Sequence, residues 1–126
     1  MLSIRKEQLK MFELHLNERF RTSLQEHVRE DLTEESKELS DFDLEKRIDH
    51  AMERGLGYGL TSECDISLFL DLMILKGIHF DRDPKLIWAR KILADPDMAG
   101  SAKMDAIYGR LAVLENRTAM PEEDEG

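Results

Sequence analysis

The segment from Ile66 to Leu75 constrains the fold of this chain more than any other. It reads ISLFLDLMIL and holds eight large apolar side chains, in a protein of which 36% of residues are charged. A membrane-spanning helix needs about 20 apolar residues, and this run is shorter and contains Asp71. In a helix, its apolar side chains would point in nearly every direction, which predicts a central helix covered by its neighbours. A partner-binding surface is the alternative, and the two interpretations can overlap.

The length and composition favour one helical domain. A chain of 126 residues suits a single domain with a small core. Its apolar residues are mainly Leu, Ile, Met and Ala, with only two Val, which favours helices over sheets. After Asn116 the sequence RTAMPEEDEG is too charged and too poor in apolar residues to fold. We therefore predict an all-α domain over residues 1–117, with a disordered acidic tail over 118–126.

Apolar spacing and capping residues predict about five helices in this compact bundle. A long N-terminal helix from about Ser3 to Asp31 has apolar residues three or four apart, namely Leu9, Phe12, Leu16, Phe20, Leu24 and Val28. A second helix over Asp41–Glu53 is expected to start after Ser40 as N-cap and to stop at the glycine-rich sequence RGLGYGLT.

The central helix is predicted over residues 62–76, capped by Thr61 or Ser62 and closed by Gly77. Asp71 within it should face a polar rim or pair with a basic side chain, because an unpaired buried carboxylate is costly. The Asp83-Pro84 pair predicts the start of a fourth helix, which should bury Trp88 against the central helix. A fifth helix is expected from Gly100 or Ser101 to Asn116, with Met104, Ile107, Tyr108, Leu111 and Leu114 facing inward.

No catalytic or cofactor motif emerges from the residues. The four histidines are dispersed, and none belongs to a metal-binding pattern. The sequence GLGYG lacks the lysine of a phosphate-binding loop, while Asp81 and Asp83 are explained as a loop residue and a helix cap. We expect no enzyme activity, no bound metal and no cofactor.

Charge and cysteine content narrow the partners and the compartment. The net charge of −9 disfavours nucleic acid, because an acidic protein repels phosphate backbones. Cys64 is the single cysteine, so no disulfide can form within the chain, and a reducing compartment is expected. The charged N-terminal sequence does not look like a signal peptide. These features favour a cytoplasmic protein with no membrane partner.

Several segments resemble a family of small helical proteins encoded beside spike and effector genes in bacterial type VI secretion clusters. The resemblance is densest over residues 54–96. It rests on Gly57-Tyr58-Gly59-Leu60-Thr61, Asp65-Ile66, Phe69-Leu70, Leu72-Met73 and the sequence GIHFDRDPKLIWARKILADP. IRKEQLKMFE near the start and KMDAIYGR near the end are also similar. Relatives often carry Pro before the Trp, where this chain has Ile87, which puts the start of the fourth helix in question.

The resemblance implies a cytoplasmic accessory of an effector module, an adaptor or co-chaperone that holds a toxin or loads it onto the spike. It supplies no catalytic residues. An immunity protein that blocks a toxin is the alternative, since acidic side chains can mimic the phosphates of a nuclease substrate. An enzyme or ligand-binding domain with an unrecognised site is the third hypothesis.

The long N-terminal helix is the predicted partner interface. At about 43 Å it would exceed the roughly 36 Å diameter of a compact domain of this length, so it should overhang, kink or pack against something else. The partner would be an effector, an effector chaperone, a spike component or a second copy of the chain. Full coverage by the second and fifth helices is the alternative. The candidate interface residues are Ile4, Met11, Phe12, Leu16 and Phe20.

Overall fold

A computed structural model describes residues 18–119 of the chain. These residues form six α-helices and two 3₁₀ helices, with no strand among them. The elements are α2 (Glu18–Asp31), α3 (Thr33–Ser36), α4 (Asp41–Gly57), α5 (Glu63–Lys76), η1 (Phe80–Arg82), η2 (Pro84–Leu86), α6 (Ile87–Leu93) and α7 (Gly100–Ala119). The predictions for residues 1–17 and for most of the acidic tail lie outside the described residues. The predicted all-α fold is confirmed.

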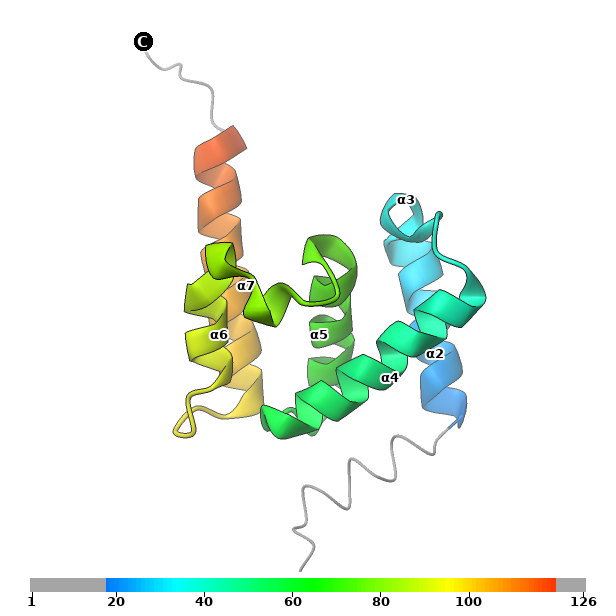
Figure 1. The fold of residues 1–126 in the computed structure, drawn as a ribbon, viewed down its shortest axis with the longest axis horizontal. Coiled ribbons are helices and arrows are strands. Elements are labelled where there is room, and N and C mark those ends of the chain that lie inside the picture. Colours follow the sequence, from blue (N-terminus) through cyan, green and yellow to red (C-terminus); the bar gives the residue numbers. More distant parts are fainter. Residues whose placement is uncertain (1–17, 120–126) are drawn as a thin grey trace, which may run out of the picture.

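The apolar segment 66–75 lies in α5, the central helix of the domain. In Figure 1, α5 stands between α2 and α3 on one side and α6 and α7 on the other, while α4 crosses beneath it. Helices α2, α3, α4 and α7 all pack against α5, as does η1. Its fully buried apolar side chains are Ile66, Phe69, Leu70, Leu72 and Met73. Because neighbours surround it, a helix without a polar face is stable in this position.

The predicted caps place the start of α4 and both ends of α5. The hydroxyl of Ser40 accepts a hydrogen bond from the backbone N–H of Asp43 at 3.0 Å. The hydroxyl of Ser62 accepts one from the N–H of Asp65, also at 3.0 Å, so Ser62 and not Thr61 is the cap. Gly77 follows α5 with φ at +112°, a conformation that L side chains rarely adopt. Local sequence therefore determines the limits of the central helix.

Helix α4 ends later than predicted. It continues from Glu53 to Gly57, through residues that were expected to stop it. Gly55 is buried inside this last turn, and a Cβ there would lie 2.6 Å from Cδ1 of Ile66. This glycine therefore serves a close approach of α4 to α5, and the reversal falls at Gly59, where φ is +83°.

The segment after α5 departs furthest from the prediction. Asp83 caps the 3₁₀ turn η2, and the α-helix begins only at Ile87. Helix α6 packs mainly against α7 and η1, while Phe80 of η1 contacts the central helix through Phe69, with ring centroids 5.3 Å apart. Trp88 packs against the hydrophobic core but is only partly buried, so its expected full burial is not reached.

Helix α7 is longer than expected. It runs from Gly100 to Ala119, past Asn116, after which the sequence was expected not to fold. Met104 and Ile107 are buried as predicted, while Tyr108, Leu111 and Leu114 are partly buried. Figure 1 shows that the second half of α7 projects beyond α6.

Candidate functional site

Three polar clusters join segments that are distant in sequence, and the first connects α4 to η1. The side chain of Asp81 is completely buried. One of its oxygens, Oδ1, accepts a hydrogen bond from Nη1 of Arg54 at 2.8 Å. The other, Oδ2, accepts one from the hydroxyl of Tyr58 at 2.6 Å. Asp81 was expected to be an ordinary loop residue, and this expectation was wrong because the η1 turn carries its carboxylate into the protein.

Tyr58 stays protonated in this cluster. Burial raises the pKa of Tyr58 to about 12, and the hydrogen bond to Asp81 and the charge of that carboxylate act in the same direction. The phenol therefore remains a hydrogen-bond donor near neutral pH. Both carboxylate oxygens of Asp81 are occupied by these two partners, so the cluster is suited to fixing η1 on α4 rather than to proton transfer.

The second cluster joins α2 to the central helix through His27. Its Nε2 lies 2.9 Å from Oδ1 of Asp71, and its Nδ1 lies 2.9 Å from Oδ2 of Asp31. Burial alone would lower the pKa of His27, but the hydrogen bond and charge of Asp71 outweigh it, and Asp31 adds to them, so the pKa is raised. Burial raises the pKa of Asp71, and its contact with His27 offsets part of that rise. The prediction that Asp71 pairs with a basic side chain is confirmed.

The third cluster is built on Lys103 of α7, which is almost completely buried. Its ammonium donates hydrogen bonds to the backbone carbonyls of Tyr58 and Leu93, both at 2.7 Å. These carbonyls belong to the ends of α4 and α6, where unpaired carbonyl groups favour a cation. Burial lowers the pKa of Lys103, and the charge of Asp95 opposes this shift. Lys103 thus ties three helix ends together from inside.

All three clusters serve internal connections. Within residues 18–119 there is no group of three or more His, Cys, Asp or Glu side chains that could hold a metal ion. Sequence reasoning missed the partnerships of Asp81 and Lys103, although Tyr58 and the FDRDP sequence stood among the segments used for the family resemblance. No local sequence pattern predicts these contacts, because each depends on how separate helices pack together.

Of the predicted interface residues, only Phe20 is described by the structure. It is 7% exposed and belongs to the hydrophobic core with Leu24 and Val28 of α2. Ile4, Met11, Phe12 and Leu16 lie outside the described residues. Helix α2 packs against α3, α4 and α5. The interface on the N-terminal helix therefore stays a prediction, and it would rest on residues other than the inward-facing Phe20.

Large apolar side chains are exposed at the end of the molecule where α5 stops, α6 starts and α7 projects. Ile87 is 49% exposed, Val113 is 56% exposed, and Leu75 is also exposed. Two contacts bring these segments together. The guanidinium of Arg110 lies 4.9 Å from the ring centroid of Trp88, next to Ile87, and Lys76, next to Leu75, pairs with Glu115 at 3.4 Å. Exposed apolar groups on neighbouring elements are typical of interaction surfaces.

The three comparisons with known proteins leave the family open. No model of a protein family matches the chain, and no curated protein or solved structure is significantly similar to it. Among the helices of the described part, none is both long enough and apolar enough to cross a membrane.

Proposed function

We propose that this protein is a non-enzymatic adaptor or co-chaperone that binds an effector-side protein of a type VI secretion module in the cytoplasm. The observation that carries the proposal is the exposure of Leu75, Ile87 and Val113, which lie on α5, α6 and α7. Apolar side chains that are not needed for the core are suited to covering an apolar segment of another protein.

The use of the polar residues supports the same proposal. Tyr58 and Asp81 come from the segments that resemble the secretion-associated family, and both are engaged in fixing η1 on α4. Phe69 and Phe80, from the same segments, pack on one another. The residues that carry the family resemblance thus serve the fold. Proteins that share an architecture but bind different partners would have such structural residues in common.

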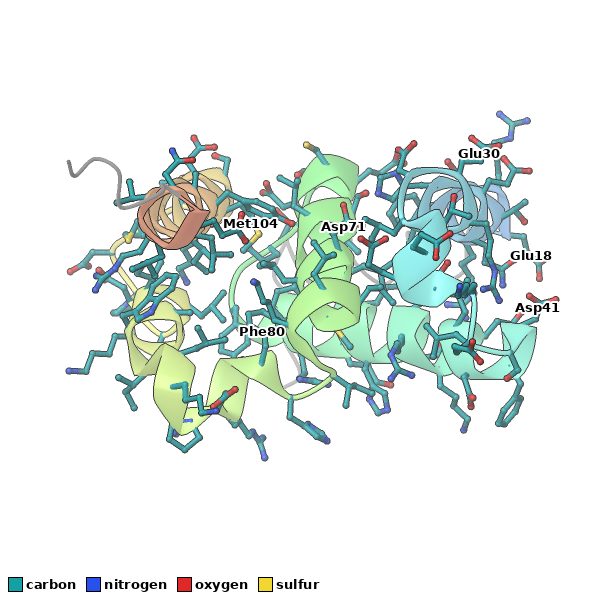
Figure 2. All side chains as sticks on the ribbon, turned by 90° about the horizontal axis from the view of Figure 1, so that it is seen from above. Glu18, Glu30, Asp41, Asp71, Phe80 and Met104 are labelled. Atoms are coloured by element: carbon teal, nitrogen blue, oxygen red, sulfur yellow. The ribbon has the colours of Figure 1, made fainter. Side chains whose placement is uncertain are left out.

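An immunity protein is the second candidate, and the acidity of α2, α3 and α4 favours it. Residues 18–53 carry twelve acidic and six basic side chains. Figure 2 shows Glu18, Glu30 and Asp41 at the end of the molecule opposite α6 and α7. Such a surface would suit the basic cleft of a nuclease toxin, because carboxylates can occupy the positions of substrate phosphates.

Co-purification from the bacterium that produces the protein tests the adaptor proposal. An affinity-tagged chain, expressed from its own locus, should retain an effector, an effector chaperone or a spike protein encoded beside it. Variants Leu75→Asp and Val113→Asp should lose this partner, whereas Cys64→Ser, at another exposed position, should keep it. Retention of no neighbouring gene product, or equal retention by all variants, would contradict the proposal.

A further inference from the structure

The outer side of α6 combines basic and apolar side chains in a protein that is otherwise acidic. Residues 76–91 carry five basic and two acidic side chains, while the net charge of the chain is −9. One of the two acidic side chains, Asp81, is buried and paired with Arg54. The other, Asp83, caps η2 by accepting a hydrogen bond from the N–H of Lys85 at 2.9 Å. The exposed charge of this segment is therefore mainly positive.

Helix periodicity gathers these side chains on one face. Ala89 and Leu93 are the buried residues of α6 and define its inner side. Ile87 and Lys91 are four residues apart, both exposed, and so neighbours on the outer side, with Arg90 beside them. No acidic residue occurs in the sequence IWARKIL. Because α6 packs against α7 and the two 3₁₀ turns, this outer side faces away from the domain.

Helix α7 extends the same face. Arg110 lies over Trp88, which is about 100° around α6 from Ile87 on the flank away from Arg90, and Val113 follows three residues later on α7. The two acidic residues of the described part of α7 point elsewhere. Glu115 pairs with Lys76 of α5, and Asp105 lies about 140° around the helix from Arg110. We call the set Ile87, Trp88, Arg90, Lys91, Arg110 and Val113 the α6 surface.

We propose that the α6 surface binds an acidic segment of a partner protein that carries large apolar side chains. Carboxylates of that segment would pair with Arg90, Lys91 and Arg110, while its apolar side chains would cover Ile87 and Val113. Opposite charges across an interface speed association and select the partner, and the central apolar contacts supply affinity. The inference rests on the proposed adaptor function and names the chemistry of the partner.

A protein segment fits this surface better than a nucleic acid does. A duplex presents a continuous row of phosphates, which the acidic remainder of the chain would repel. Figure 2 shows Glu18, Glu30 and Asp41 at the opposite end of the molecule. A short acidic segment can contact this face without approaching the acidic end.

Fluorescence anisotropy with a synthetic peptide tests the proposal on the full-length protein. The probe is a labelled helical peptide with Leu at every third or fourth position and Glu or Asp at most others. We expect binding that weakens with added salt, and a loss of about tenfold or more in the variant Arg90→Glu/Lys91→Glu. The matched control is Arg19→Glu/Lys37→Glu, which makes the same charge change at exposed positions of α2 and just after α3 and should bind as the unmodified protein does. Ile87→Ser should weaken binding and leave its salt dependence unchanged.

Five results would overturn the proposal, and the first four concern binding and assembly. They are equal affinity in both double variants, equal binding of a control peptide with Lys in place of every acid, tighter binding of a short DNA duplex, and a dimer that only Arg90→Glu/Lys91→Glu dissociates. The proposal would also be overturned if the peptide bound only after Glu122, Glu123, Asp124 and Glu125 were replaced by their amides. The chain's own acidic tail would then be the segment that occupies the α6 surface. Circular dichroism would be used to check that each variant is folded. If Arg90→Glu/Lys91→Glu still retains the co-purified partner, only this inference fails; if the peptide binds but no partner co-purifies, the adaptor function fails instead.

Discussion

The hydroxyl of Tyr58 and the carboxylate of Asp81 are joined by a 2.6 Å hydrogen bond across 23 residues of sequence. Together with the ion pair from Arg54 to Asp81, this bond holds η1 against the end of α4. In that position Phe80 packs on Phe69 of the central helix. The core beneath α6 therefore depends on a buried polar cluster as well as on apolar packing.

Replacing Asp81 with Asn should destabilise the domain strongly. The amide keeps the shape of the side chain but removes its charge and leaves the mostly buried guanidinium of Arg54 without a counter-ion. Loss of one partner of a buried ion pair costs about 3–5 kcal/mol. Chemical denaturation would measure this loss. Asp105→Asn, an exposed change of the same kind on α7, should shift the free energy of unfolding by less than about 0.5 kcal/mol. Similar stabilities for the two variants would show that the cluster contributes little.

Two glycines of α7 should respond to alanine in opposite directions. At Gly100 a Cβ would lie 2.8 Å from the backbone oxygen of Gly59, so Gly100→Ala must push the α4–α5 turn away and should cost about 1–3 kcal/mol. At Gly109 a Cβ would meet nothing within 4 Å, and alanine there should stabilise the helix by about 0.5–1 kcal/mol. Thermal unfolding of both variants checks the sign of each change. A stabilised Gly100→Ala would mean that α7 starts further from the turn than the structure places it.

The His27 cluster should make stability depend on pH. Because the contacts with Asp71 and Asp31 raise the pKa of His27 above 6.5, its contribution is complete below that pH and is lost as the pH rises through the folded-state value. The pKa of Asp71 is raised above 3.8, so its contribution to the free energy of unfolding also decreases as the pH rises through its folded-state pKa. The free energy of unfolding should therefore decrease above pH 6.5, by up to about 1 kcal/mol for such a partly exposed group.

Chemical denaturation at several pH values would measure how much of the decrease in the free energy of unfolding is due to His27. In His27→Gln the decrease above pH 6.5 should be smaller than in the unmodified protein, whereas His50→Gln, at an exposed position of α4, should retain it. If His27→Gln shows the full decrease, the link between α2 and α5 does not depend on the charge of His27.

The limits of α5 were predictable from sequence, whereas the path of the chain after it was not. Ser62 and Gly77 act through their own backbone neighbours, so the cap and the stop can be recognised locally. Gly55 looked like a helix stop because glycine is common there, yet it lies within α4 to admit Ile66. The burial of Asp81 and Lys103 depends on partners on other helices, which a single sequence does not identify. The exposed face of α6 was likewise not predicted, since Trp88 was expected on a buried inner face.

Trp88, the only tryptophan of the chain, reports on the α6 surface. The guanidinium of Arg110 lies over its partly buried ring, so the emission maximum should fall between those of buried and fully exposed indoles. Arg110→Ala should shift the emission to longer wavelength and cost about 0.5–1 kcal/mol, the usual range for an exposed cation–π contact. Arg110→Lys should keep part of the effect. An unchanged spectrum in Arg110→Ala would place this guanidinium away from the ring.

Secretion and survival after deletion of the gene test the adaptor function most directly. The neighbouring effector would be measured in the culture medium and in the cells, and the growth of the deletion strain would be followed beside its parent. We predict that the effector disappears from the medium while the deletion strain survives, and that the unmodified gene restores secretion. Normal secretion combined with death or self-intoxication of the deletion strain would contradict the adaptor function and support an immunity protein.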